Sequence, residues 1–353
     1  MGLFIFEYIE KSNLKVGECH DVKRLLGLCA YTNKGLLKMN KLLLRVKNFI
    51  EWISILFYNT LFFLCVSIWR KDIIVNSFLK QIGGRDKIKH SNFGDDLNYY
   101  LVKELSGKNV ICYNNLLFKY CGIKICNLLC IGSIIGMLSD NKTIVWGAGA
   151  IECMPLNSKN KPSKVLAVRG PLTREYLIKY GIDCPKIYGD PALLLPLLYM
   201  PKSRHKIYKI GVIPHYVDLD SHVVNEFVKK GNGTIKLINV VNYTDWHDII
   251  DEICSCEFII SSSLHGLIVS DAYNIPNVWV KFSSKIWGHD FKYHDYYASV
   301  HKDNVLPKII KTISDIDNLF DLKDKWRPIN IDLTDLKRTC PFDFKKVLIK
   351  DKL

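Results

Sequence analysis

The chain has 353 residues, which is long for one ordinary hydrophobic core and favours two domains. Hydrophobic residues make up 48% of it and charged residues 24%, so the composition excludes a disordered chain. Lysine and arginine number 49 against 35 aspartates and glutamates, a formal net charge of +14. This surplus suits phosphorylated metabolites or lipid head groups, and is equally typical of a lysine-rich solvated surface. The sequence has no arginine-rich tract or RNA-binding signature, so we expect no nucleic-acid partner.

The cysteines form neither a disulfide framework nor a usual zinc pattern. Cys121, Cys126 and Cys130 share one apolar segment, and Cys254 and Cys256 are separated by one residue. No pair has the C-x-x-C spacing of a metal or redox motif. We therefore expect free thiols in a reducing cytoplasm, and nothing in the pattern demands a metal.

An uncharged apolar run at residues 52–69 precedes the first domain pattern. It has tryptophan at both ends, and basic residues flank it, with Arg45 and Lys47 before it and Arg70 and Lys71 after it. The run is at the short limit for a membrane span, and its internal polar residues favour a packed helix instead. Membrane contact, by spanning or by lying on anionic lipid, and burial against the protein both remain open.

From residue 72 the sequence has an α/β pattern. Strands are predicted at 73–75, 110–113, 142–146 and 164–168, and a helix with one apolar face at 97–105. Asn92 or Asp95 could cap that helix, whose N-terminus would face an anion or a hydroxyl. Gly147 and Gly149 follow the third strand, where glycine lets the backbone approach a ligand, although a tight turn explains them equally.

Two arginines and an aspartate follow the last of these strands. Arg169 stands at the strand tip, which favours a ligand role over a structural ion pair. Arg174 lies in the first turns of a proline-started helix, where a cation opposes the helix dipole, and the two roles are equally open. Asp190 precedes another proline-started helix, so it could cap that helix or orient an arginine or a sugar hydroxyl.

A second α/β unit begins after a linker at 197–208. It opens with an apolar strand in the run 209–215, which His215 follows. Further strands are predicted at 235–240, 258–260 and 277–280, with a helix at 245–253. We therefore predict an α/β fold of two Rossmann-like domains facing across a cleft. The expected division is an N-terminal extension at 1–71 with the apolar helix, domains at 72–200 and 201–330, and a C-terminal tail at 331–353.

The turn Ser-Ser-Ser-Leu-His-Gly at 261–266 stands between an apolar strand and an apolar helix. It places His265 at the C-terminal end of a strand, where open α/β sheets bind ligands. His215 also follows an apolar strand and is a weaker candidate. A single histidine is more often structural, but the hydroxyl-rich turn favours a functional role for His265.

Five motifs in one order carry a resemblance. The chain resembles the polysaccharide pyruvyl transferase family over about residues 88–300. The resemblance implies a GT-B-like fold and transfer of a pyruvyl group from phosphoenolpyruvate to a sugar, giving a ketal on a surface polysaccharide. The motifs are Asn-Phe-Gly-Asp at 92–95, Trp-Gly-Ala-Gly at 146–149, Arg-Gly-Pro-Leu-Thr-Arg at 169–174, Gly-Asp-Pro-Ala at 189–192 and Ser-Ser-Leu-His-Gly at 262–266.

Ketal formation needs a group that moves protons and cations that hold the donor's phosphate and carboxylate. Histidine titrates near neutrality, so we expect His265 to act as general acid and base, and Arg169 as the donor clamp. No cofactor beyond phosphoenolpyruvate as donor is implied, and the acceptor is expected to be a lipid-linked saccharide. The predicted substrate-binding residues are Arg174, Asn92, Asp95, Gly147, Gly149, Asp190, Ser263, Leu264, Gly266 and Lys281.

One departure from the family concerns Ser263, because many members have arginine at that position. We expect Arg169, Arg174, Lys281 or Lys285 to supply the missing charge.

Two other functions remain open from the sequence. One is a glycosyltransferase that uses a nucleotide sugar on the same architecture, and the other is a non-catalytic, membrane-associated assembly protein. The expected location is the cytoplasm, at the inner face of the membrane.

Overall fold

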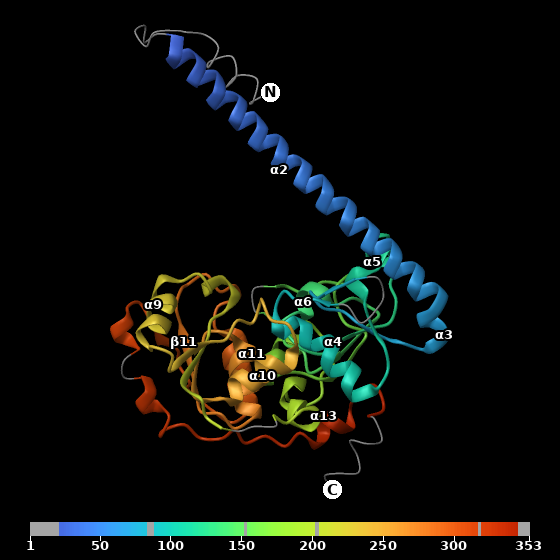
Figure 1. The fold of residues 1–353 in the computed structure, drawn as a ribbon. Coiled ribbons are helices and arrows are strands. Elements are labelled where there is room, and N and C mark those ends of the chain that lie inside the picture. The colour runs from blue at the N-terminus through green and yellow to red at the C-terminus, as the bar shows by residue number, and fades with distance from the viewer. Residues whose placement is uncertain (1–20, 83–87, 152–153, 202–204, 317–318, 345–353) are drawn as a thin grey trace. The chain divides into compact units, whose positions relative to one another are not determined.

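The computed structural model describes residues 21–82, 88–151, 154–201, 205–316 and 319–344, with side chains from residue 40 onward. The chain divides into two units, residues 1–54 and 55–353, which are described separately. The described part of the first unit is the beginning of helix α2 (Asp21–Phe62), drawn in blue in Figure 1. The second unit holds everything that follows.

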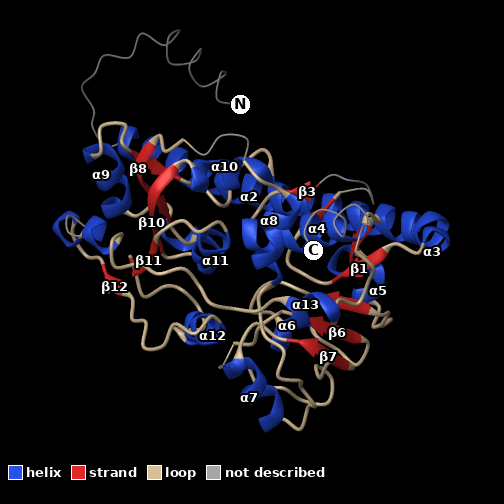
Figure 2. Ribbon diagram, turned by 90° about the horizontal axis from the view of Figure 1, so that it is seen from below, coloured by secondary structure: helices blue, strands red, loops and turns tan. Residues whose placement is uncertain are grey.

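The second unit contains two parallel sheets of five strands each. The first sheet has the order β4-β1-β5-β6-β7 and the second the order β12-β11-β10-β8-β9. Figure 2 shows the strands in two separate groups, with β1, β6 and β7 in one and β8, β10, β11 and β12 in the other. When the strands of each sheet are numbered in chain order, both sheets have the doubly wound order 2-1-3-4-5. The predicted α/β fold with two Rossmann-like domains is confirmed.

The elements of the first sheet and its connections alternate strands with helices, as parallel pairing requires. Their bounds are β1 (Ile73–Val75), β2 (Lys80–Gln81), β3 (Ile88–Lys89), α4 (Phe93–Ser106), β4 (Val110–Cys112), η2 (Tyr113–Asn115), α5 (Leu117–Tyr120), β5 (Asn127–Leu129), α6 (Ile135–Leu138), β6 (Thr143–Trp146), β7 (Lys164–Ala167), α7 (Pro171–Lys179), η3 (Pro191–Leu194) and α8 (Leu195–Leu198).

The second sheet repeats the alternation, and three short elements follow it. The bounds are β8 (Tyr208–Ile213), η4 (Tyr216–Asp218), α9 (His222–Lys230), β9 (Ile235–Leu237), α10 (Trp246–Cys254), β10 (Cys256–Ser261), α11 (Leu264–Ala272), β11 (Asn277–Lys281), α12 (Phe291–Ser299), β12 (Lys308–Ile309), η5 (Ile313–Asp315), η6 (Leu319–Leu322) and α13 (Thr334–Arg338).

The sheets are joined where their strands end. The amide of Phe93, at the start of α4, donates to the carbonyl of Val240 at 2.8 Å. Tyr243 donates its hydroxyl to Oδ2 of Asp96 at 2.6 Å, and one cluster of buried apolar side chains contains residues of both sheets. These contacts hold the C-terminal ends of the two sets of strands toward each other.

A buried ion pair ties α12 to the first sheet. Arg169, just after β7, donates from Nε to Oδ2 of Asp295 at 2.9 Å, and both side chains are fully buried. Thr173 donates its amide to Oδ1 and its hydroxyl to Oδ2 of the same carboxylate, at 2.8 and 2.7 Å. A Cβ at Gly170 would come within 1.9 Å of the Asp295 carbonyl oxygen, so glycine is needed for α12 to approach. The Arg-Gly-Pro-Leu-Thr motif is therefore the docking surface for α12.

The C-terminal residues beyond 330 pack against the first sheet as far as they are described. Leu336 of α13 is fully buried, and its carbonyl accepts a hydrogen bond from Nε1 of Trp146 at 2.9 Å. The described part of the segment expected as a tail, residues 331–344, thus contributes to the core, and 345–353 lie outside the described residues.

The apolar run at 52–69 is helical, through the end of α2, a π-helical turn (η1, Phe63–Ser67) and α3 (Ile68–Arg70). The helix from Asn40 to Arg70 contains an 18-residue window with a mean hydropathy of 1.8, and by length and composition it could cross a membrane. Within the second unit, however, Asn59 is buried and donates to the carbonyls of Gln81 and Asn115 at 3.1 and 3.2 Å. One side of this part of the helix packs on the protein.

Replacing Asp295 tests the ion pair as a structural constraint. Asp295→Ala leaves a buried guanidinium unpaired, so we expect the free energy of unfolding in urea to fall by about 3–5 kcal/mol. The matched control is Asp290→Ala, which removes the partly exposed partner of Lys281 and should cost about 0–1 kcal/mol. Equal costs for the two substitutions would contradict this role for Asp295.

Candidate active site

A cavity of about 480 Å³ lies at the C-terminal ends of strands from both sheets. In a sheet of order 2-1-3-4-5, the ligand-binding crevice lies between strands 1 and 3 of that sheet, because the connections before and after this point run in opposite directions. In the first sheet these strands are β1 and β5, followed by the lining residues Phe78, Gly132 and Ser133. In the second they are β8 and β10, followed by the lining residues His215 and Ser263. The cavity therefore occupies the switch points of both sheets.

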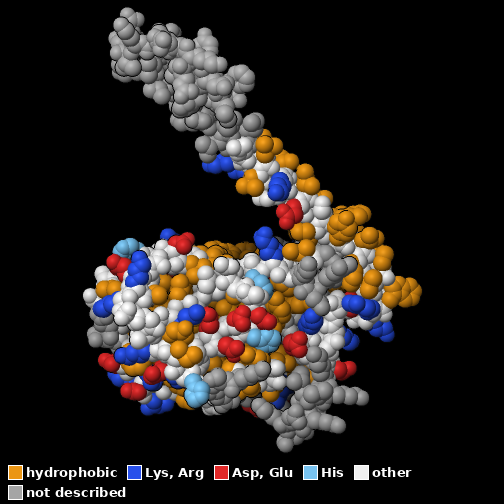
Figure 3. Space-filling model, viewed as in Figure 1, with side chains coloured by type: hydrophobic (Ala, Val, Ile, Leu, Met, Phe, Trp, Pro, Cys, Tyr) orange, Lys and Arg blue, Asp and Glu red, His pale blue; other side chains and the backbone are white. Residues whose placement is uncertain are grey.

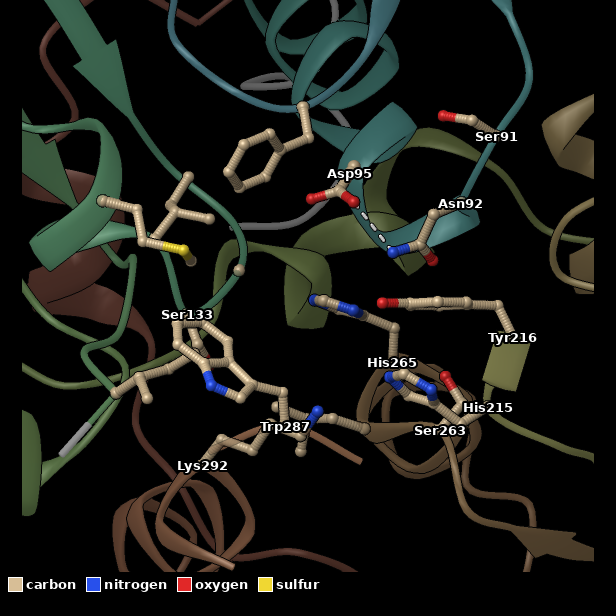
Figure 4. A pocket seen from close by; sticks show the side chains of 16 residues that line it. Ser91, Asn92, Asp95, Ser133, His215, Tyr216, Ser263, His265, Trp287 and Lys292 are labelled. Carbon is tan, nitrogen blue, oxygen red and sulfur yellow. Dashed lines mark hydrogen bonds between the residues drawn. The ribbon is translucent and has the colours of Figure 1, made fainter. Parts of the chain in front are cut away.

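His265 enters this cavity from the first turn of α11, and Figure 4 shows it facing Asn92 and Asp95 of the opposite side. Its Nδ1 lies beside Gly94, where an added Cβ would come within 2.0 Å. Its Nε2 is buried, 3.9 Å from the equally buried Oδ2 of Asp190. Neither atom has a hydrogen-bond partner among the described residues. Three motifs of the sequence thus meet at one imidazole ring.

Burial changes the proton affinity of this group. Burial, together with the charges of Arg169, Lys292 and His215, lowers the pKa of His265 to about 3. Burial raises the pKa of Asp190 to about 7 and that of Asp95 to about 6. In this structure His265 is neutral at pH 7, so the premise that it titrates near neutrality is wrong. The carboxyl groups beside it are the ones that titrate in that range.

The serine turn before α11 is held by hydrogen bonds. The Ser261 hydroxyl donates to the carbonyl of Ile213 at 3.0 Å and accepts the amide of Ser263 at the same distance. Ser262 accepts the amide of His215 at 2.8 Å and donates to Asp218 at 3.1 Å. These bonds leave the Ser263 side chain to line the cavity.

Four more of the predicted binding residues lie at or beside the cavity. Asn92, Asp95 and Leu264 line it, and the Asn92 amide donates to Oδ2 of Asp95 at 2.8 Å. Asn92, one of the two predicted caps, is the N-cap residue of α4, but its side chain makes no capping hydrogen bond. Gly266 lies one turn along α11, where a Cβ would come within 2.4 Å of the Ser261 hydroxyl.

Two predicted arginines do not line the cavity. The guanidinium of Arg169 is held by Asp295, by the Ser133 hydroxyl at 2.6 Å and by the Ala150 carbonyl at 3.4 Å. It lies behind the cavity wall. The favoured ligand role of Arg169 is therefore wrong, and the structure has the alternative, a structural ion pair. Arg174 donates to the carbonyl of Cys184 at 2.9 Å.

The remaining predicted residues have structural partners. A Cβ at Gly149 would come within 2.3 Å of Cζ of Arg169, and one at Gly147 within 2.3 Å of Cδ of Pro191. Lys281 pairs with Asp290 at 2.6 Å. These two glycines and this lysine are not among the residues that line the cavity.

Sequence reasoning missed Lys292, the only lysine or arginine among the described residues that line the cavity. It lies in the first turn of α12, and burial lowers the pKa of its ammonium to about 8. The buried side chains of Tyr293, Tyr296, Tyr297 and Val300 have helical spacing, so the periodicity could have revealed this helix. Trp287 and Tyr216 of the lining were also missed.

Comparison with known proteins matches this chain to one protein family. Residues 92–284 match the family described as Polysaccharide pyruvyl transferase, which is more than half of the chain. The chain belongs to this family. The matched region includes Asn92, Asp190 and His265, and it ends before Lys292.

Two relatives show how far the similarity extends. An uncharacterized protein of Acanthamoeba polyphaga mimivirus is 28% identical over 232 residues, covering 65% of this chain and 75% of that protein. The succinoglycan biosynthesis protein ExoV of Rhizobium meliloti (strain 1021) is 26% identical over 216 residues, covering 59% of this chain and 61% of ExoV. The chain is thus an enzyme of the polysaccharide pyruvyl transferase family and is similar to a succinoglycan biosynthesis protein.

The contact between Gly94 and His265 can be tested by a double-mutant cycle. Gly94→Ala should destabilise the protein by about 1–3 kcal/mol, because the new methyl group collides with the imidazole. In a His265→Ala background the same change should be neutral or stabilising, since alanine favours a helix over glycine. Urea unfolding of the four proteins measures the coupling. An equal cost of Gly94→Ala in both backgrounds would contradict the contact.

Proposed function

We propose that the protein transfers the pyruvyl group of phosphoenolpyruvate to a sugar of a surface polysaccharide or its lipid-linked precursor, forming a ketal. The observation that carries the proposal is the cavity at the switch points of both sheets, lined by His265 of the family-matched region, with Asp190 buried 3.9 Å from its Nε2. Family membership supports the donor and the saccharide class of the acceptor.

The reaction places defined demands on the residues. The enol methylene carbon gains a proton, one sugar hydroxyl adds to the central carbon, and phosphate leaves. A second hydroxyl then closes the ketal, so one donor and one diol yield the ketal and one inorganic phosphate. A neutral imidazole can accept a hydroxyl proton, which His265 does at Nδ1, the ring nitrogen beside Gly94.

Asp190 orients this base. When its carboxylate is ionised, it faces Nε2 of His265 and favours the tautomer with the proton on Nε2, which leaves Nδ1 free to accept one. The distance of 3.9 Å is longer than a hydrogen bond, and such contacts commonly tighten when substrate binds. The pKa of about 7 means that this state forms as the pH rises through neutrality.

The assay is phosphate release from phosphoenolpyruvate in the presence of saccharide acceptors extracted from the producing cell, with mass spectrometry of the product for the ketal. His265→Ala should lower kcat/KM by about 10²- to 10⁴-fold, the usual contribution of general acid–base catalysis. For the wild type, kcat/KM should fall as the pH drops below about 7, where Asp190 gains a proton. Asp190→Asn should remove this decrease in kcat/KM at low pH.

His222→Ala is the matched control, because His222 is highly exposed on α9 and does not line the cavity. Full activity of His265→Ala would refute the assignment of the base. Release of a nucleoside phosphate from a nucleotide sugar, without use of phosphoenolpyruvate, would refute pyruvyl transfer.

We also propose that the N-terminal helix binds an anionic membrane surface at the cytoplasmic face. In the first unit Val46, Ile50 and Ile53 are exposed and recur every three or four residues. In the second unit the same spacing continues with four exposed side chains, Phe57, Leu61, Leu64 and Ile68. Figure 3 shows hydrophobic side chains gathered along the described part of this helix.

This spacing defines an apolar helix face, and basic residues lie near it at Lys41, Arg45, Lys47 and Arg70. Such a helix lies in the interfacial plane, where the basic residues contact anionic lipid. Burial of Asn59 against the protein favours lying on the membrane over crossing it. A lipid-linked acceptor would be presented at the same surface.

Sedimentation of the full chain with phosphatidylcholine–phosphatidylglycerol vesicles tests this surface. The wild type should sediment with them, and Leu61→Asp should weaken binding by about tenfold through loss of a buried apolar side chain. Asn48→Asp adds the same charge at a polar exposed position and should bind nearly as well. Equal binding of both variants, or no sedimentation of the wild type, would contradict the proposal.

A further inference from the structure

Lys292 lacks the carboxylate partner that two other lysines near the second sheet have. Lys281 pairs with Asp290 and Lys302 with Asp271, at 2.6 and 3.1 Å. The Lys292 side chain lines the cavity, and no carboxylate of the described residues lies within ion-pair distance of its ammonium.

The ammonium lies 5.3 Å from the centroid of the Tyr293 ring, but it has no carboxylate partner. A partly buried ammonium without a carboxylate partner is unfavourable unless an anion reaches it. Desolvation and the nearby charge of Arg169 lower the pKa of Lys292, Asp95 offsets a part, and the net pKa is about 8. His215 and His265, which line the same cavity, are neutral and supply no negative charge. Asp95 lines the same cavity and its charge acts on Lys292, but beyond ion-pair distance, so the ammonium has no direct carboxylate partner among the described residues.

The other cations near the cavity are already committed. Arg169 is held by Asp295 and Ser133, and Lys281 by Asp290. Lys285 is exposed and does not line the cavity. An anion that enters the cavity thus meets Lys292 as the one described lysine or arginine in the lining.

We propose that Lys292 is the cation that binds the phosphate group of the donor substrate. The assignment rests on the proposed function for the identity of the donor, and on the cavity itself for the anion. An ammonium is a compact point charge suited to phosphate, and the first turn of α11 adds its amide end to the same cavity wall through Ser263, Leu264 and His265.

This assignment also accounts for Ser263. Ser263 and Lys292 line the same cavity from different elements, α11 and α12. A positive charge at either position would face the same bound anion. The charge supplied from the start of α12 makes a cation at the start of α11 unnecessary.

The experiment measures binding by titration calorimetry, with phosphoenolpyruvate, inorganic phosphate and pyruvate as separate probes. Lys292→Met should weaken phosphoenolpyruvate and phosphate by about 10- to 100-fold, the range of a charge-assisted contact, and should leave pyruvate nearly unchanged. Lys292→Arg should keep most of the affinity. Lys311→Met, which removes an exposed lysine that does not line the cavity, is the matched control.

Charge relocation separates binding from folding. Adding Ser263→Arg to Lys292→Met should recover a substantial part of the lost phosphate affinity, at least about fivefold, which a merely structural role for Lys292 would not allow. Thermal unfolding without ligand should show that Lys292→Met is as stable as the wild type.

The outcomes separate the two proposals. Wild-type phosphate affinity in Lys292→Met, or loss of pyruvate affinity alone, would overturn the assignment of Lys292 to phosphate. Phosphate binding that depends on Lys292, with phosphoenolpyruvate bound no better than inorganic phosphate and no pyruvyl transfer, would support the anion site and refute the proposed function. A wild type that binds none of the probes would overturn both.

Discussion

The buried pair between Arg169 and Asp295 is the constraint on which the site depends. It joins the end of β7 to α12, an element 126 residues later in the chain, with Thr173 donating twice to the same carboxylate. Because α12 is fixed there, Lys292 in its first turn is held against the cavity. The guanidinium also acts at a distance, since its charge lowers the pKa of both His265 and Lys292. A residue outside the cavity thereby sets its position and its electrostatics.

The second constraint is steric, and it explains how motifs that are far apart in the sequence meet at one place in the structure. Gly94 is the residue against which the imidazole of His265 lies, and Gly147 makes room for Pro191, which follows Asp190. Each glycine permits a contact between elements of the site, and neither needs to touch a ligand for this role. The motif that begins at Asn92, the motif around Asp190 and the serine turn are therefore one structural unit around His265.

The fold was largely predictable, because buried parallel strands are continuous apolar runs such as Phe258, Ile259 and Ile260. Short β5 was missed since Asn127 interrupts its pattern. The site was predictable where it depends on position after a strand, as for His265 and Ser263. The structural role of Arg169 was not predictable, because an arginine after a strand can be exposed to a ligand or buried against a carboxylate. Its partner Asp295 lies on a helix outside the recognised motifs. Lys292 was missed for the same reason, because it lies on the same helix, α12.

These constraints together make the state of His265 depend on what occupies the cavity. Three positive or potentially positive groups, Arg169, Lys292 and His215, disfavour a proton on His265, which is also desolvated. A phosphate held at Lys292 would add negative charge among these groups, and by the same Coulombic argument it would raise the pKa of His265 toward neutrality. The histidine would then be a base before the donor binds and a competent acid beside it. Protonating the enol methylene carbon requires an acid, so donor binding itself would create the group that its first chemical step needs.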